Sequence, residues 1–155
     1  MSSYLTFYLV PKKTRVVYKE GKGEEEVKVS EGIPLPLIIY TRSSNIYQLF
    51  YEKIHPVYAG LEEKYTTLTI EKMKDLLNTY RREISEDEKH YENKIQVIRE
   101  LGGNLETVNI NELIEDSNLI KEKKETLVEL EFISSLVHDV EFGYTGFEKV
   151  LINID

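Results

Sequence analysis

The chain has 155 residues, 41% of them hydrophobic and 31% charged, and a formal net charge of −8 at pH 7. This length predicts one domain with a substantial core, and the composition argues against global disorder. The absence of cysteine excludes disulfides, thiol catalysis and cysteine-based zinc sites, while the negative charge disfavours nucleic-acid binding by the whole surface.

The first forty residues predict β-strands. Residues Tyr4 to Val10 alternate between larger apolar and more polar side chains, as a strand does. The runs Arg15 to Lys19 and Glu26 to Val29 flank the glycine-containing segment Glu20 to Glu24, which indicates a β-hairpin. A further strand is expected over Leu35 to Thr41, and its prolines favour an edge or entry position in a sheet.

A short helix is expected over Asn45 to Ile54, capped by the preceding serines and with Ile46, Leu49, Phe50 and Ile54 facing inward. Residues 55–68 predict an irregular connection, since Pro56 and Gly60 interrupt any regular pattern. The strand end that enters this helix offers free backbone amides to an anion. The candidate anion-binding residues there are Arg42, Ser43, Ser44 and Asn45.

The strongest pattern is the three-four spacing of apolar residues in two long segments, near Thr69 to Leu101 and Asn109 to Phe142. The first series is Ile70, Met73, Leu77, Tyr80, Ile84, Tyr91, Ile98 and Leu101. The second series is Leu113, Ile120, Leu127, Leu130 and Val137. Gly102-Gly103 separates the two predicted helices, Asn109 with Glu112 forms a capping-box-like start for the second, and Gly143 ends it.

Charged residues interrupt both series, and their positions predict how the helices pair. If the helices are antiparallel and opposed residue numbers sum to about 210, Lys94 meets Asp116 and Asp87 meets Lys123. A sum near 214 is the alternative register, in which these charges meet only diagonally. We favour the first register because an unpaired charge at a helix seam is costly.

Residues Phe147 to Ile154 alternate again and predict a strand that returns to the sheet. The expected fold class is therefore α+β: a small antiparallel or mixed β-sheet head with one short helix, plus a long antiparallel two-helix coiled-coil hairpin. The head comprises 1–68 together with 144–155, the hairpin arm comprises 69–143, and the two form a single continuous structural unit. The second helix is apolar on several faces between Leu130 and Val140, including Phe132, and we expect that end to be packed.

Two groups of residues are candidates for an interface. Tyrosines crowd the connection between head and hairpin, and tyrosine favours interfaces because it buries a large area with few rotors. Apolar residues outside the main seam are expected to be partly exposed on a two-helix arm. The candidate interface residues are Tyr47, Tyr51, Tyr58, Tyr65, Leu76, Ile95 and Val97.

These patterns favour a non-enzymatic protein-interaction or assembly protein that associates with itself or with a protein partner. The sequence is rich in lysine, glutamate, isoleucine and tyrosine, and in this composition it resembles accessory or structural proteins of bacteriophages. The resemblance rests on no motif, so it assigns no role to any residue. The alternatives are a nucleic-acid-associated factor that binds through the basic head segment 11–19, and small anionic-ligand binding at residues 42–45.

No cofactor, metal or catalytic residue is expected, because the three histidines lie far apart in the sequence and no glycine-rich phosphate loop is present. The first ten residues have no basic stretch and no apolar run approaches the ~20 residues of a membrane span, so we expect neither a signal peptide nor membrane insertion. The expected location is the cytoplasm, or a virus particle or infected bacterial cell.

Overall fold

The computed structural model of the chain describes residues 3–55, 64–102 and 110–155. It divides into two compact units: a head unit, Met1–Met73 with Ile133–Asp155, and an arm unit, Lys74–Phe132. The dividing lines fall inside two long helices, α3 (Ile70–Glu100) and α4 (Ile110–Glu141). The predicted α+β fold class is confirmed.

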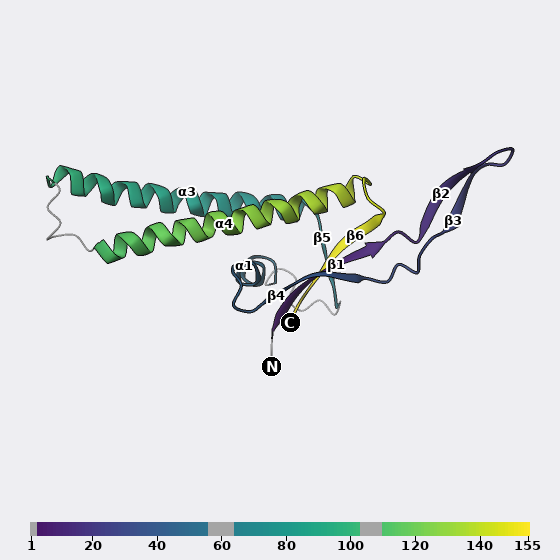
Figure 1. The fold of residues 1–155 in the computed structure, drawn as a ribbon, viewed down its shortest axis with the longest axis horizontal. Coiled ribbons are helices and arrows are strands. Elements are labelled where there is room, and N and C mark those ends of the chain that lie inside the picture. Colours follow the sequence, from purple (N-terminus) through teal and green to yellow (C-terminus); the bar gives the residue numbers. More distant parts are fainter. Residues whose placement is uncertain (1–2, 56–63, 103–109) are drawn as a thin grey trace. The chain divides into compact units, whose positions relative to one another are not determined.

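The main sheet of the head unit has four strands in the order β4-β1-β6-β5, with every neighbouring pair antiparallel (Figure 1). β1 (Tyr4–Pro11) and β6 (Phe147–Ile154) form its centre, and β4 (Leu35–Thr41) lies at one edge, as expected. The other edge is β5 (Thr66–Leu68), and the prediction of an irregular connection was wrong for these three residues. Three residues are too few to show the alternation that identifies a strand.

The core of the head unit joins the sheet to α1 (Asn45–Lys53). Ser44 caps this helix, because its Oγ accepts a hydrogen bond of 3.2 Å from the Ile46 amide. The ring of the fully buried Phe50 meets the ring of Phe7 edge-on, with their centroids 5.4 Å apart. The apolar face of α1, given by its three-four spacing, thus packs against the apolar face of β1, given by its two-residue alternation.

The predicted hairpin is present as a separate two-stranded sheet of β2 (Thr14–Lys19) and β3 (Gly23–Lys28). Glycines with positive φ, Gly21 and Gly23, allow the turn between the strands. Every side chain of the two strands is exposed except those of Val17 and Val27, which are half-buried. The described part of the chain therefore provides no covering layer for this ribbon.

The long helices begin and end close to the predicted residues. The hydroxyl oxygen of Thr69 accepts a hydrogen bond of 3.2 Å from the Lys72 amide at the start of α3, and Gly102 follows its end with φ 73°. α4 ends in a Schellman motif, in which the amides of Gly143 and Tyr144 bond to the carbonyls of Val140 and Asp139 at 3.2 and 2.9 Å. Gly103 and the expected cap at Asn109 lie outside the described residues.

Candidate interaction surfaces

Edge strand β4 carries three exposed aliphatic side chains, Leu35, Leu37 and Ile39, which we call the β4 surface. The segment from Gly32 to Thr41 contains no charged residue. A bulge at Leu37 shifts the pairing with β1, and Pro36 has no N–H to donate. Both features discourage uncontrolled strand pairing along this edge, yet they leave the apolar side chains accessible.

Tyr47, a predicted interface residue, is buried in the head unit, so this prediction was wrong. Its side chain is 3% exposed, and its hydroxyl donates a 2.8 Å hydrogen bond to the backbone carbonyl of Asp155. The residue therefore anchors the end of the last strand to α1. The sequence could not show this, because the two partners are 108 positions apart.

The remaining predicted interface tyrosines differ in their surroundings. Tyr51 is exposed, and its ring stacks between those of Tyr47 and His55. Tyr65 is half-buried and lies edge-on to Tyr8 at 5.1 Å. Tyr58 lies outside the described residues. Of the described tyrosines in the predicted group, Tyr51 offers the largest accessible ring.

The three apolar residues predicted to lie outside the helical seam differ in their exposure to solvent. Leu76 is only 4% exposed, so its prediction as an interface residue was wrong. The buried stripe is wider than a two-helix seam at that end of α3, because Met73 and Leu77 flank Leu76 and are buried too. Ile95 is half-buried and Val97 is exposed; Ile95 lines a shallow hollow on α3 with Tyr91, Asn93 and Arg99.

In the arm unit the helices lie antiparallel with their charged residues paired. The Nζ of Lys123 lies 2.6 Å from Asp87 Oδ2, and the Nζ of Lys94 lies 2.7 Å from Asp116 Oδ2. Both pairs have residue numbers that sum to 210, so the helices adopt the register favoured from the sequence rather than the alternative near 214. Lys94 also bonds to Glu112 at 2.7 Å.

Burial and the Asp87–Lys123 pair change the pKa of two groups between the helices. Burial lowers the pKa of Lys123, but the hydrogen bond and charge of Asp87 outweigh it, so the net pKa is raised above the ordinary 10.5. Burial raises the pKa of the Tyr80 phenol above its ordinary 10.0, and a hydrogen bond with Thr126 opposes this in part. The Lys123 ammonium and the Tyr80 phenol are thus both held protonated more firmly in the fold.

We therefore expect alkaline pH to destabilise the protein. A group whose pKa is raised by folding contributes stability that is complete below its unfolded pKa and is lost as the pH rises through its folded pKa. The free energy of unfolding, measured by urea titration, should fall as the pH rises above the ordinary values of 10.0 for tyrosine and 10.5 for lysine. The Tyr80→Phe variant should show a smaller alkaline loss. A free energy that stays constant through this range would contradict the assignment.

Several polar groups of the predicted anion site at the start of α1 are used within the fold. Ser44 caps the helix, the hydroxyls of Ser43 and Thr41 lie 3.0 Å apart, and the Gln48 amide donates to the Arg42 carbonyl at 2.6 Å. Asn45 has interactions of its own within the fold. Helix capping and turn formation explain this geometry without a ligand.

The basic segment 11–19 lies beside acidic residues of the neighbouring strand. Tyr18 pairs with Glu24, Val17 with Glu25 and Val16 with Glu26 across the hairpin, and Lys19 Nζ lies 2.9 Å from Glu25 Oε2. Between Lys12 and Glu31 the chain has six basic and five acidic residues. The local field of this hairpin is therefore close to neutral, which is unfavourable for binding a polyanion.

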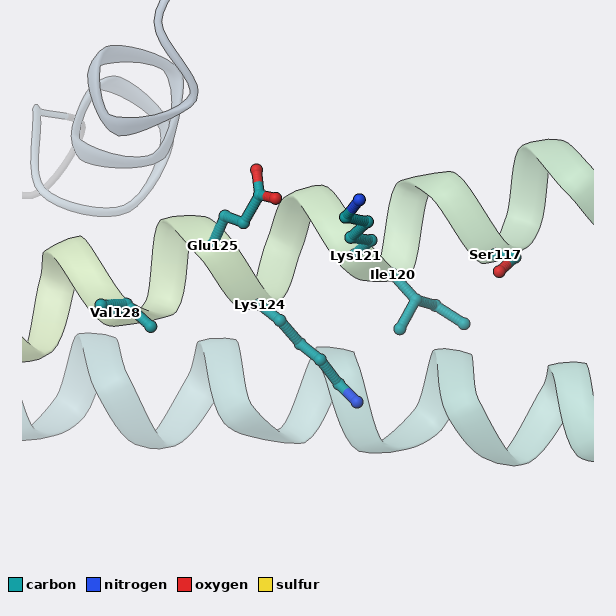
Figure 2. Close-up of a pocket in the computed structure, with 6 residues that line it drawn as sticks. All are labelled: Ser117, Ile120, Lys121, Lys124, Glu125 and Val128. Carbon is teal, nitrogen blue, oxygen red and sulfur yellow. The ribbon is translucent and has the colours of Figure 1, made fainter.

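The outer side of α4 carries an exposed apolar series that the sequence analysis missed. Ile114, Val128 and Phe132 are all more than half exposed, although Phe132 was expected to be packed. A hollow on this helix is lined by Ser117, Ile120, Lys121, Lys124, Glu125 and Val128 (Figure 2). The signal that could have revealed the series is a second three-four spacing in α4, offset from the seam residues.

Among residues 3–55, 64–102 and 110–155, no three histidine, aspartate or glutamate side chains gather in a way that could hold a metal ion. None of the helices within these ranges is both long and apolar enough to cross a membrane. The chain matches none of the protein families, curated proteins or solved structures with which it was compared.

Proposed function

We propose that this chain is a non-enzymatic protein-interaction or assembly protein, and that the β4 surface is its principal contact with a protein partner. The observation that carries the proposal is the exposure of Leu35, Leu37 and Ile39 on an edge strand without charges. The bulge places Leu35 on the face of Leu9 and Ile39 on the face of Thr6, so apolar side chains are exposed on both sides of this edge. Edge strands are usually protected by charged side chains, and exposed apolar side chains favour protein contacts.

The half-buried charges of the arm unit support a structural role for the hairpin. Asp87 and Lys123 form an ion pair with each other between the two helices. Such a pair specifies the alignment of the helices, as polar residues at coiled-coil seams do. A hairpin with a fixed alignment is suited to present its outer surfaces to other proteins.

A protein partner is favoured over a nucleic acid by the hairpin of β2 and β3. Its glutamates lie beside its basic residues, so the charge available to phosphates is small. Tyr18 is exposed on the same hairpin, and an exposed tyrosine is suited to contacts with protein. The Ser44 hydroxyl is used by the helix cap and the Ser43 hydroxyl lies beside that of Thr41, so an anionic ligand is also less favoured.

The substitution Ile39→Lys should weaken partner binding without affecting the fold. Ile39 is 60% exposed, so a lysine there is solvated in the free protein but places a charge in the apolar contact. We expect at least about a tenfold loss of affinity for any protein that the wild-type chain retains from an extract of its source. The free energy of unfolding should change by less than about 0.5 kcal/mol.

Val16→Lys is the matched control, because Val16 is also a β-branched residue on an exposed strand and is 58% exposed. It should leave retention of the partner intact. Equal loss of retention in Val16→Lys and Ile39→Lys would show that the β4 surface is not specific. Retention by Ile39→Lys equal to that of the wild type would contradict the proposed contact.

A further inference from the structure

Six residues on the outer side of α4 form a second heptad series within the arm unit, which we call the outer series. Its members are separated by four, three, four, three and four positions and are all exposed; they are Ile114, Asn118, Lys121, Glu125, Val128 and Phe132. Three of the six, Ile114, Val128 and Phe132, are apolar, and exposed apolar residues at this spacing can pack along another helix. The residues that face α3, such as Asp116 and Lys123, belong to a different side of α4.

The two charged residues of the outer series, Lys121 and Glu125, differ from the charged residues that pair between α3 and α4. Lys121 and Glu125 project from α4 on the side away from α3, whereas Lys124 reaches toward α3 (Figure 2). The Nζ of Lys124 lies 3.3 Å from Glu88 Oε1, but no ion pair of Lys121 or Glu125 occurs among the residues that the structure describes. These two charges are therefore available to a partner.

We propose that two copies of this chain associate through the outer series, with their α4 helices antiparallel and opposed residue numbers summing to 246. This inference rests on the proposed interaction function and names a second copy of the chain as one partner. In this register Ile114 lies opposite Phe132 of the second copy, and Asn118 lies opposite its Val128. Lys121 lies opposite Glu125 of the second copy, and twofold symmetry repeats each contact.

Charge complementarity selects this register over its competitors. A parallel pairing in register would place Lys121 against Lys121 and Glu125 against Glu125, and like charges across a helix pair are unfavourable. A shift by one heptad in one direction places Ile114 opposite Glu125, and in the other direction places Lys121 opposite Phe132. Among these pairings, only the sum of 246 places Ile114 opposite Phe132 and Lys121 opposite Glu125, with Val128 opposite Asn118.

The dimensions of the contact are those of a helix pair. The outer series runs from residue 114 to residue 132, which corresponds to about 27 Å of helix at 1.5 Å per residue. Four large apolar side chains, two Ile114 and two Phe132, would be removed from water, together with two Val128. Apolar contacts flanked by charged pairs are typical of such helix interfaces.

Sedimentation velocity of the full-length chain over a wide range of concentrations tests the proposal. We expect the wild type to approach a dimer as concentration rises. Either Lys121→Glu or Glu125→Lys alone should raise the dissociation constant at least about tenfold, because each places like charges at two symmetric layers. The double variant K121E/E125K restores opposite charges and should recover association. Lys89→Glu, the same charge change at an exposed residue of α3, should have little effect.

A disulfide trap gives an independent readout, because the chain contains no cysteine. Introducing Ile114→Cys together with Phe132→Cys should yield a covalent dimer on mild oxidation, as the two positions face each other across the proposed interface. They lie about 27 Å apart on one helix, so they cannot bridge within a chain. Circular dichroism should show that all variants keep their helices.

A wild type that remains monomeric at the highest concentration would overturn the dimer. So would a double variant no more associated than either single one, or a trap that yields no covalent dimer. If no dimer forms but Ile39→Lys loses a partner that the wild type retains, the dimer is contradicted and the proposed function is not. If the dimer forms but Ile39→Lys retains every protein that the wild type retains, the role of the β4 surface is contradicted and the dimer is not.

Discussion

The substitution Phe50→Ala should lower the free energy of unfolding by about 3–5 kcal/mol. Phe50 is fully buried and meets Phe7 edge-on, and Phe7 in turn packs edge-on against Tyr40 at 5.8 Å. Removing the ring loses both its burial and the contacts on its faces, and it leaves a cavity between α1 and β1. Because folded domains are stable by only about 5–15 kcal/mol, this loss is a large share of the total.

Phe132→Ala is the matched control, since the same side chain is 64% exposed on the outer side of α4. It should change the free energy of unfolding of the monomer by less than about 0.5 kcal/mol. Urea titration at low protein concentration measures both variants without a contribution from association. Equal losses in the two variants would contradict the assignment of Phe50 to the core and of Phe132 to the surface.

Reversing Asp87 to lysine should cost about 1–3 kcal/mol, between the value of an exposed ion pair and that of a broken buried one. The Nζ of Lys123 lies 2.6 Å from Asp87 Oδ2, and both side chains are about two-thirds or more shielded from solvent. The Asp87→Lys substitution therefore brings two ammonium groups together at one step of the seam. Adding Lys123→Asp restores opposite charges and should recover much of the loss.

A double-mutant cycle on the two reversals isolates their coupling. Glu86→Lys, a charge reversal at the neighbouring exposed position of α3, serves as the control and should cost less than about 0.5 kcal/mol. Strictly additive losses for Asp87→Lys and Lys123→Asp would mean that the residues do not meet. Urea titration of the four chains is sufficient for this comparison.

The register of the arm could be predicted because its signal is local and repeated. The three-four spacing identifies the seam. The charged residues that interrupt it lie directly opposite each other in one register, in which Lys94 meets Asp116 and Asp87 meets Lys123. The same reasoning did not extend to Leu76. Its burial depends on a wider packed surface at one end of α3, which the spacing of a two-helix seam does not describe.

Most elements of the head could be predicted, with β5 (Thr66–Leu68) as the exception, but their contacts could not. Alternation identified β1 and β6, and the serines before α1 identified the cap at Ser44. The burial of Tyr47 depends on a hydrogen bond to Asp155 at the far end of the chain, and a tyrosine count cannot reveal such a bond. Nor could the sequence show that Ile39 would remain exposed, since exposure is decided by which elements cover the sheet.

Hydrogen–deuterium exchange across Leu35–Thr41, measured with and without a protein retained by the wild-type chain, tests the central claim most directly. A partner seated on the β4 surface should slow exchange of the accessible amides of this strand, while those of β2 and β3 keep their free-state rates. The Ile39→Lys variant should show no such slowing at the same partner concentration. Unchanged exchange over Leu35–Thr41 in a complex that nevertheless forms would contradict the claim that this surface is the contact.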